Sequence, residues 1–493
     1  MAVEETVGTD QPKLRRNLNV WEAIGISLAL MAPSMAANIN PQGTASTVGR
    51  ATPVAFALAF VGVLLVAYTF VRLTQRFHHS GSVYGFVGAT LGPLGGVVAG
   101  LALTGTYLFY AVTTAIAGGR FAANFLSALG VWSSAPNWAA YLLAIAGLLL
   151  VGWIATTPAR NSTRLLVAAE GITVMLILIV GLIIFVKLLG HSGPGKLGVT
   201  SQIFSMPPGT GLSAIFLGVV FGFLSFAGFE AAATLGEETT HPNRDIPRAI
   251  LGVAIFGGIY FFVVTAVEVM GFGTSAKGTA AFINSTSLMG DLGSSYVSSW
   301  LGNLITFGAM VSAFSCCLAC VVGSARLIFA MSRDGMLNRR LGAVSAKQSS
   351  PVASTWAIVA VAAVILVVDL IVNVNTLTLF AQTGTIGTLI LLVVYVLATI
   401  GMVLLVFFRG RTEVRRWELI IPALAVIVLG YTLYRNVWPW PSGVALWGTI
   451  VPIVWLVVAL AYSAARPAAT KRAGELLMRS EGLSAAQSAA KSS

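Results

Sequence analysis

Residues 225 to 230, Ser-Phe-Ala-Gly-Phe-Glu, interrupt an apolar run that extends from residue 212 to residue 236. Glycine weakens a helix and a carboxyl group is costly to bury in lipid, so this patch predicts an opened helix that faces the protein interior. A second interruption, Ala-Pro-Ser-Met-Ala at residues 32 to 36, lies in the first apolar run. There Pro33 removes a hydrogen-bond donor and clashes with the preceding turn. Opened backbone is tolerated at membrane depth only where it lines a cavity, so the two patches predict a shared buried site.

The composition indicates a chain that resides in a membrane. Hydrophobic residues make up 57% of the 493 residues and charged residues only 9%, against about a quarter in an ordinary soluble domain. The apolar runs are long enough to cross a hydrocarbon core of about 30 Å as helices. We predict an all-α polytopic membrane protein of about twelve transmembrane helices, without a cleaved signal peptide. The predicted spans are residues 22–48, 53–73, 83–117, 136–157, 164–187, 212–236, 249–271, 298–331, 352–373, 377–408, 418–436 and 444–465.

The basic residues are divided unevenly between the predicted loops. The net charge is +12, but with a cytoplasmic N-terminus 23 of the 29 Lys and Arg fall inside. This distribution follows the positive-inside rule and argues against a nucleic-acid partner. We expect a multi-pass protein of the plasma (cytoplasmic) membrane with both termini cytoplasmic. The basic residues expected outside are Arg50, Arg120, Lys187, Lys196, Lys277 and Arg435.

The positions of the two interruptions indicate an inverted repeat. They fall in the first and sixth predicted spans, so the two halves enter the membrane from opposite sides, an arrangement typical of secondary transporters. We predict a first repeat at 21–200, a second at 201–410 and two appended helices at 411–465. Residues 1–20 and 466–493 are expected to be cytoplasmic tails, the second without ordered structure. The alternative is that Pro33 only kinks a packed helix and Gly228 only permits close packing.

A longer string around the second interruption resembles the sixth-helix signature of the amino acid-polyamine-organocation (APC) superfamily. It comprises Phe-Ala-Gly-Phe-Glu-Ala-Ala at 226–232, Leu-Gly-Glu-Glu at 235–238, and Asp-Ile-Pro-Arg-Ala-Ile at 245–250. Residues 79–84 with 91–96 look like the entry to the family's third helix, and residues 323–326 with 331–335 look like the cytoplasmic end of the eighth. The resemblance extends over about residues 20 to 410. It implies a permease with two inverted five-helix repeats and broken helices 1 and 6.

The resemblance also implies how a substrate is held. Backbone amides of the opened first helix would bind a carboxylate, and carbonyls of the opened sixth would bind an amine, in agreement with the charges of helix ends. Many relatives have glycines in the first break where this chain has Ala, Pro, Ser and Met, so an amine without an amino acid head group remains an alternative. Tyr107 borders the cavity or packs in the core. The predicted binding residues are Ala32, Pro33, Ser34, Met35, Ala36, Tyr107, Phe226, Ala227, Gly228, Phe229 and Glu230.

Two carboxyl groups inside predicted spans are candidates for proton coupling. A charge at the centre of a transmembrane helix costs about 2.5 to 3.5 kcal/mol, so such groups face the protein or a water path. Glu170 is the first choice because we expect it to lie away from the substrate's backbone contacts, and Glu230 is the second. The alternatives are structural: a partner for Arg164 or for a neighbouring helix in the first case, and an acceptor for freed backbone amides in the second. Hydroxyls of Ser312 and Ser315 would be the ligands if sodium were coupled instead.

The absence of catalytic and nucleotide-binding motifs argues against other classes of protein. No Ser-His-Asp set, HExxH or GxxxxGK[ST] occurs, so we expect no enzyme, no ATP-driven pump, no cofactor and no metal centre. The cysteines Cys316, Cys317 and Cys320 are read as small core residues. The leading interpretation is a secondary transporter whose partners are an amino acid or amine, protons and the lipid bilayer. An exchanger or a nutrient sensor that keeps the binding site is the alternative.

Overall fold

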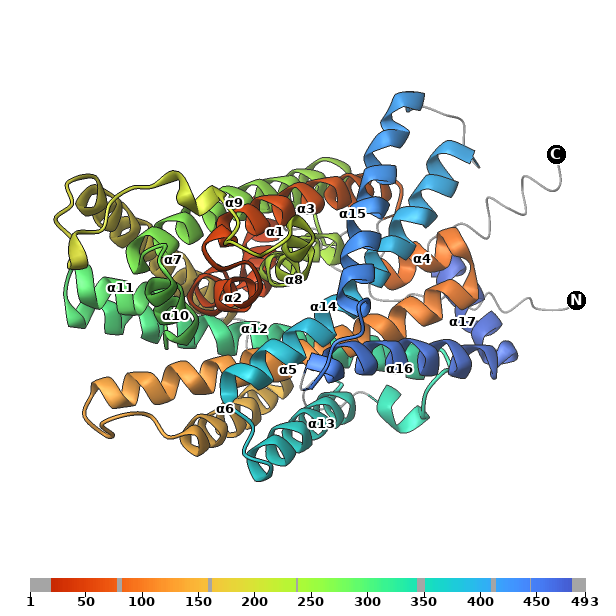
Figure 1. The fold of residues 1–493 in the computed structure, drawn as a ribbon. Coiled ribbons are helices and arrows are strands. Elements are labelled where there is room, and N and C mark those ends of the chain that lie inside the picture. Colours follow the sequence, from red (N-terminus) through yellow and green to blue (C-terminus); the bar gives the residue numbers. More distant parts are fainter. Residues whose placement is uncertain are drawn as a thin grey trace, which may run out of the picture.

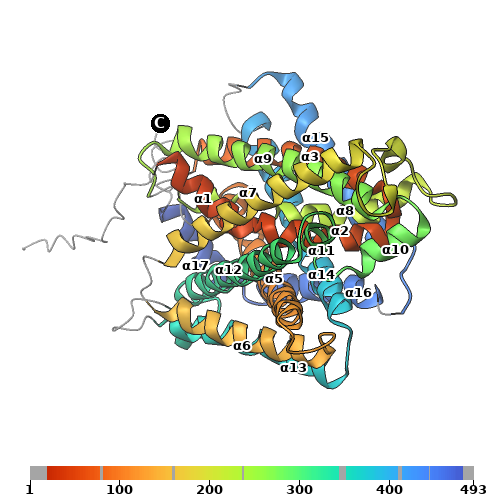
Figure 2. The ribbon, with the colours of Figure 1, turned by 90° about the vertical axis from the view of Figure 1, so that its left-hand side faces the viewer.

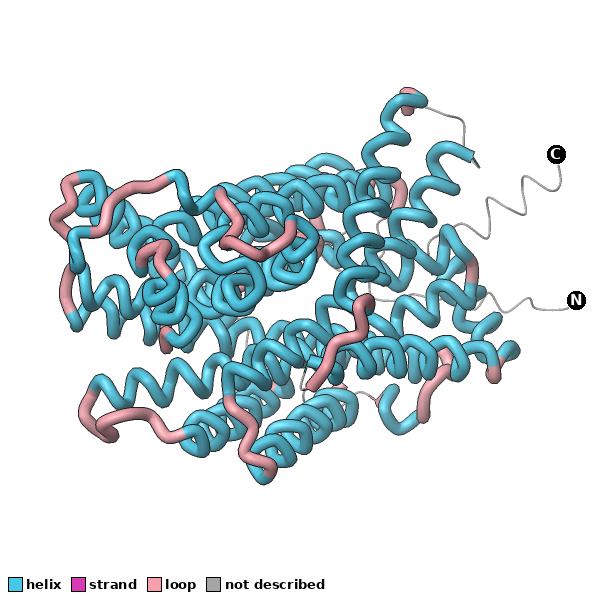
Figure 3. The backbone as a smooth tube through the Cα atoms, viewed as in Figure 1, coloured by secondary structure: helices cyan, strands magenta, loops and turns pink. Residues whose placement is uncertain are grey.

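The computed structural model describes residues 19–77, 82–157, 162–235, 238–343, 351–408, 414–443 and 445–480. Within these ranges the chain is helical and contains no strand. Figure 3 shows helices joined by loops and turns, the segment between Leu189 and Ile215 being a long one. The helices are α1 Val20–Met31, α2 Pro33–Val48, α3 Thr52–Thr74, α4 Ser82–Leu91, α5 Pro93–Ala128, α6 Asn137–Thr156, α7 Ser162–Leu189, α8 Ile215–Phe226, α9 Pro242–Phe272, α10 Ala276–Asn284, α11 Leu288–Tyr296, α12 Ser299–Arg333, α13 Val352–Ile371, α14 Thr376–Val403, α15 Ile420–Val437, α16 Ala445–Ala464 and α17 Pro467–Ser480.

Eleven segments of the described chain are long and apolar enough to cross a membrane. The first of them, Val20–Thr74, contains both the first and the second predicted spans. The all-helical, polytopic membrane fold predicted from the sequence is thereby confirmed. The number twelve and the inverted repeat stay predictions.

Three elements differ from what the apolar runs predicted. The third predicted span is two helices, α4 and α5, because Gly92 adopts a φ of +91° and Pro93 begins a new helix. Two short helices, α10 and α11, lie between the seventh and eighth predicted spans. The tail was expected to lack ordered structure, but α17 continues to Ser480, and Ala473 on α17 is fully buried. Residues 78–81, at the start of one stretch that carried the family resemblance, lie outside the described residues.

The long helices form two groups, seen from two directions in Figures 1 and 2. In one group α1, α2, α3, α8 and α9 pack together, and in the other α5 packs against α6, α12 and α14. Helix α7 contacts α9 of the first group and α12 of the second. Helices α15 and α16 pack on the outside against α14. Helix α1 also contacts α12, and α8 contacts α14. The C-terminal ends of α1 and α8 therefore lie where the two groups meet.

Small residues bring the helices of the second group close together. A Cβ atom at Gly119 would overlap the carbonyl oxygen of Ala140, so α5 and α6 touch through their backbones. Gly118 and Gly147 both accommodate the ring of Phe314 from α12. In lipid, where apolar side chains gain little by leaving the solvent, such close packing is a main source of helix association.

Candidate functional site

The first helix of the chain breaks at a single residue. Ala32 has φ 47° and ψ 58°, a left-handed conformation, and it ends α1. The following proline accounts for this break, because a residue before proline is displaced from the right-handed helical region. Pro33 then takes the first position of α2, where its missing N–H group has no helical partner to lose. The break predicted at Pro33 is present.

The second break follows the end of α8 at Phe226. Ala227 leaves the helix with ψ 126°, Gly228 has φ +103°, and the chain enters the short helical turn Ala231–Leu235. A Cβ atom at Gly228 would lie 2.7 Å from Leu30 Cγ and 3.1 Å from the Leu30 carbonyl carbon. Glycine is required at this position for two reasons: the backbone has a positive φ, and Leu30 leaves no space for a side chain. The two interruptions thus touch, through Gly228 and the last turn of α1.

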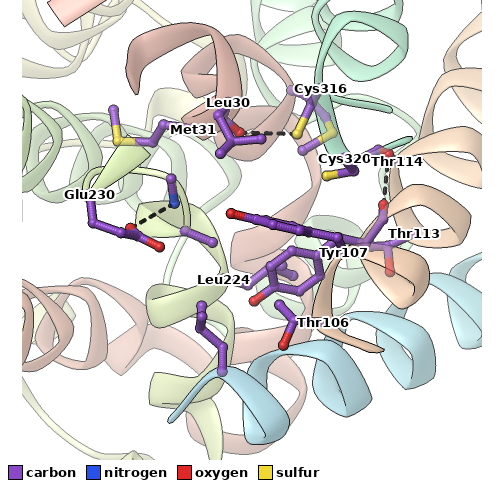
Figure 4. A pocket seen from close by; sticks show the side chains of 15 residues that line it. Leu30, Met31, Thr106, Tyr107, Thr113, Thr114, Leu224, Glu230, Cys316 and Cys320 are labelled. Carbon is purple, nitrogen blue, oxygen red and sulfur yellow. Dashed lines mark hydrogen bonds between the residues drawn. The ribbon is translucent and has the colours of Figure 1, made fainter. Parts of the chain in front are cut away.

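A buried cavity lies beside this contact and is shown in Figure 4. It is bounded by α1 and α2, by the broken end of α8, and by α5, α12 and α14. In Figure 4, Glu230 lies on one side of the cavity, and Cys316 and Cys320 lie on another. The lining residues are Leu30, Met31, Met35, Thr106, Tyr107, Tyr110, Thr113, Thr114, Leu224, Ala227, Gly228, Glu230, Cys316, Cys320 and Leu391.

The structure brings the two predicted patches together, although only part of each lines the cavity. Met35, Tyr107, Ala227, Gly228 and Glu230 contribute to the wall. The other predicted residues are buried beside it without being among the lining residues: Ala32, Pro33, Ser34, Ala36, Phe226 and Phe229. The Tyr107 ring is held by α12, because a Cβ atom at Gly323 would lie 3.2 Å from Tyr107 Cε2.

Glu230 places a carboxyl group in the wall of the cavity. Its side chain is buried, and Oε2 accepts a hydrogen bond of 3.2 Å from the Gly228 N–H. The carboxyl group therefore satisfies a backbone donor that the break sets free, as the structural alternative predicted. It also lines the cavity, and its role in substrate binding or coupling stays a prediction.

Glu170 contacts the opened first helix directly. Its Oε1 atom accepts a 2.8 Å hydrogen bond from the Ser34 N–H, and Ser312 Oγ accepts a 3.2 Å bond from the Met35 N–H. The carboxyl group on α7 thus caps the N-terminus of α2, where the helix dipole favours a negative charge. The expectation that Glu170 lies away from the binding backbone was wrong. The side chain of Arg164, its alternative partner, lies outside the described residues.

The chain as a whole matches a known family. Residues 18–463 match the family model described as amino acid permease. The chain belongs to the amino acid permease family. The match confirms the resemblance to the APC superfamily that residues 226–250 indicated in the sequence.

Named relatives of this permease differ in what they carry. It is 26% identical over 327 residues to the branched-chain amino acid permease BcaP of Bacillus subtilis, covering 63% of this chain and 66% of that relative. It is 24% identical over 381 residues to the low-affinity putrescine importer PlaP of Escherichia coli, covering 75% and 79%. It is also 28% identical over 344 residues to an uncharacterized transporter of Mycobacterium tuberculosis, covering 69% and 71%. One relative is thus named for amino acids and another for an amine.

Four residues that bring hydroxyl groups to the permease's cavity were not predicted from the sequence. Tyr110 follows Thr106 by four residues on α5, and Thr113 and Thr114 follow Tyr110 by three and four, which places them near one face of the helix. Thr114 Oγ1 donates to the Tyr110 carbonyl at 2.7 Å, whereas Thr106 Oγ1 has no hydrogen-bond partner among the described residues. The periodic threonines were the available signal.

The cysteines of the permease are divided between the core and the cavity. Cys317 is buried with its sulfur 3.5 Å from the Ala111 carbonyl oxygen, in agreement with the sequence interpretation. Cys316 and Cys320 instead line the cavity, and Cys316 Sγ donates to the Leu30 carbonyl at 3.0 Å. Cys320 follows Cys316 by four residues, about one turn of helix, so the two share a face that Cys317 does not.

Ser315, a candidate sodium ligand in the sequence, uses its hydroxyl group within its own helix. Its Oγ atom donates to the Val311 carbonyl at 2.7 Å.

Proposed function

We propose that this permease is a secondary active transporter that moves amino acids or related amines across the cytoplasmic membrane by alternating access, coupled to protons. The observation that carries the proposal is the meeting of two broken helices at a buried cavity with Glu230 in its wall. Opened backbone at membrane depth is typical of transporter binding sites. The family membership and the relatives named for branched-chain amino acids and putrescine support the same activity.

The proposed architecture follows the sequence prediction. Residues 21–200 and 201–410 form two inverted repeats, 411–465 are appended, and both termini are cytoplasmic. The cavity between the breaks is the substrate site, and alternating access exposes it to either side. A sensor or an exchanger with the same site differs in that a proton gradient does not drive accumulation.

Glu170 is proposed as the coupling residue because of what it holds. As an anion it accepts a charge-assisted hydrogen bond at the N-terminus of α2, and such bonds contribute about 1.5 to 3 kcal/mol. A proton on Glu170 removes the charge and weakens the cap. The break between α1 and α2 is thereby free to change its angle, which links the proton to the shape of the cavity.

The test uses purified protein in liposomes with labelled amino acids and amines and an imposed pH gradient. Glu170→Gln keeps a carbonyl acceptor for Ser34 but cannot titrate, so it is expected to abolish gradient-driven accumulation while preserving binding and counterflow. Glu230→Gln removes the charge of the cavity and is expected to weaken binding itself. Asp369→Asn, on the peripheral helix α13, is the matched control and keeps both activities.

The outcomes separate the proposals. If Glu170→Gln concentrates substrate as well as the parent does, Glu170 is not the coupling residue. If the parent requires sodium in place of the pH gradient, proton coupling is refuted. If the parent exchanges substrate but never accumulates it, the exchanger replaces the active transporter.

A further inference from the structure

The N-terminus of α2 has no backbone donor left for a ligand. Pro33 carries no N–H group, and the Ser34 and Met35 N–H groups are taken by Glu170 and Ser312. The next N–H group, that of Ala36, donates to the Ala32 carbonyl at 2.9 Å. A substrate carboxylate bound at this helix end would need these same donors. The protein itself satisfies each of them.

The cavity also lacks a positive side chain that could replace those donors. Among the described residues that line it, Glu230 carries the one carboxyl group, and none is Lys, Arg or His. Arg120 lies on α5 about 20 Å along the helix beyond Tyr107, and its Nη2 atom donates to the Ser285 carbonyl at 3.0 Å. A carboxylate placed in the cavity would lie beside the Glu230 carboxyl group without a compensating cation.

The same wall suits an ammonium group. An ammonium has three donors and no acceptor. Glu230 supplies a carboxylate, the Leu30 carbonyl keeps a second lone pair beside the Cys316 thiol, and Thr106 Oγ1 is buried without a partner in the described part of the chain. The wall also contains apolar side chains that suit an alkyl body, beside the hydroxyl groups of Tyr107, Tyr110, Thr113 and Thr114. Its apolar members are Leu30, Met31, Met35, Leu224 and Leu391.

From this arrangement we infer that the substrate is a small organic amine without a carboxylate, held through its ammonium group at Glu230. The inference rests on the proposed function, because it takes the cavity to be the transport site, and it narrows the substrate class from amino acids and amines to amines. Glu170 and Ser312 act in it as positioning residues, since they occupy the donors that an amino acid would require.

Matched pairs of compounds test the inference on the full-length protein. Each pair consists of an amino acid and its decarboxylation product: leucine with isoamylamine, phenylalanine with phenethylamine, and ornithine with putrescine. Binding to the purified protein and uptake into liposomes are measured for both members. We expect at least one amine to bind at least ten-fold more tightly than its amino acid. If every amino acid binds as tightly as its amine and is transported, the inference fails while the proposed function stands. If no compound of either class is transported under any gradient, the proposed function fails.

A pair of serine variants tests whether the occupied backbone donors of α2 are what excludes a carboxylate. Ser312→Ala removes the acceptor of the Met35 N–H, and Met35 lines the cavity, so the variant offers a donor to a carboxylate. We expect Ser312→Ala to narrow the difference in affinity within each pair at least three-fold. Ser315→Ala removes a hydroxyl that bonds only to the Val311 carbonyl in the described structure and should leave the difference unchanged. An unchanged difference in Ser312→Ala contradicts the inference, and so does an equal change in both variants. Should Ser312→Ala not fold, the paired affinities of the parent protein still decide.

Discussion

Cys316 brings a thiol to the wall of the cavity, whereas Cys317 next to it points into the core. If the cavity opens to water during transport, a water-soluble cationic thiol reagent reaches Cys316 and is attracted by Glu230. In proteins that retain one cysteine, with the others replaced by alanine, we expect Cys316 to react at least about ten-fold faster than Cys317, since reaction requires an accessible thiolate. Modification of Cys316 should block transport, and bound substrate should protect it. Equal rates at the two cysteines, or modification that leaves transport intact, would remove Cys316 from the transport path.

At the scale of the element, the break between α1 and α2 stores strain in one residue. Ala32 adopts a left-handed conformation that costs about 1 to 2 kcal/mol for a residue other than glycine. Glycine relieves this strain but adds about 0.4 to 1 kcal/mol of conformational entropy to the unfolded chain. We expect Ala32→Gly to raise the free energy of unfolding by about 0.5 to 1 kcal/mol, measured as the unfolding midpoint in detergent.

The control for this prediction lies one turn earlier in the same helix. Ala29 is helical, so Ala29→Gly should lower the free energy of unfolding by about 0.5 to 1 kcal/mol. A loss of stability in Ala32→Gly as large as that in Ala29→Gly would mean that Ala32 is not strained by a left-handed conformation. The second break is less suited to such a series, because any side chain at Gly228 meets Leu30 and a strained backbone at once.

At the scale of the whole molecule, the predicted orientation places the loop before α8 outside and the start of α9 inside. Single cysteines are introduced at Ser192 and at Asn243 in a protein whose three native cysteines are alanine. A membrane-impermeant reagent added to intact cells should label the Ser192→Cys protein and leave the Asn243→Cys protein unlabelled until the membrane is opened. Labelling of both from the same side would refute the predicted topology.

Much of this architecture could be predicted from the order of residues along the chain. Apolar runs located the spans because lipid requires long uninterrupted helices. Pro33 and Gly228 located the breaks, since proline restricts the local backbone and glycine permits a conformation that other residues rarely adopt. The break at Gly92 carries similar local signals and was overlooked inside a long apolar run.

The wall of the cavity could be predicted only in part, because it depends on how each helix is rotated about its axis. Cys316 and Cys317 have the same chemistry and adjacent positions, yet one lines the cavity and the other packs in the core. The contact between Glu170 and Ser34 was missed for a related reason. It joins helices far apart in the chain, and local pattern carries no information about such a pairing.

The hydrogen bond from Ser34 to Glu170 also constrains how the protein is made. Its two partners are 136 positions apart in the chain, so α2 leaves the ribosome long before α7 does. Until α7 is inserted, the Ser34 N–H group cannot donate to Glu170, and until α12 is inserted, the Met35 N–H group cannot donate to Ser312. Both caps of α2 therefore form only after the fifth and the eighth predicted spans have been made. We expect the capped form of the first helix to be completed late in biosynthesis, although that helix is the first to be translated.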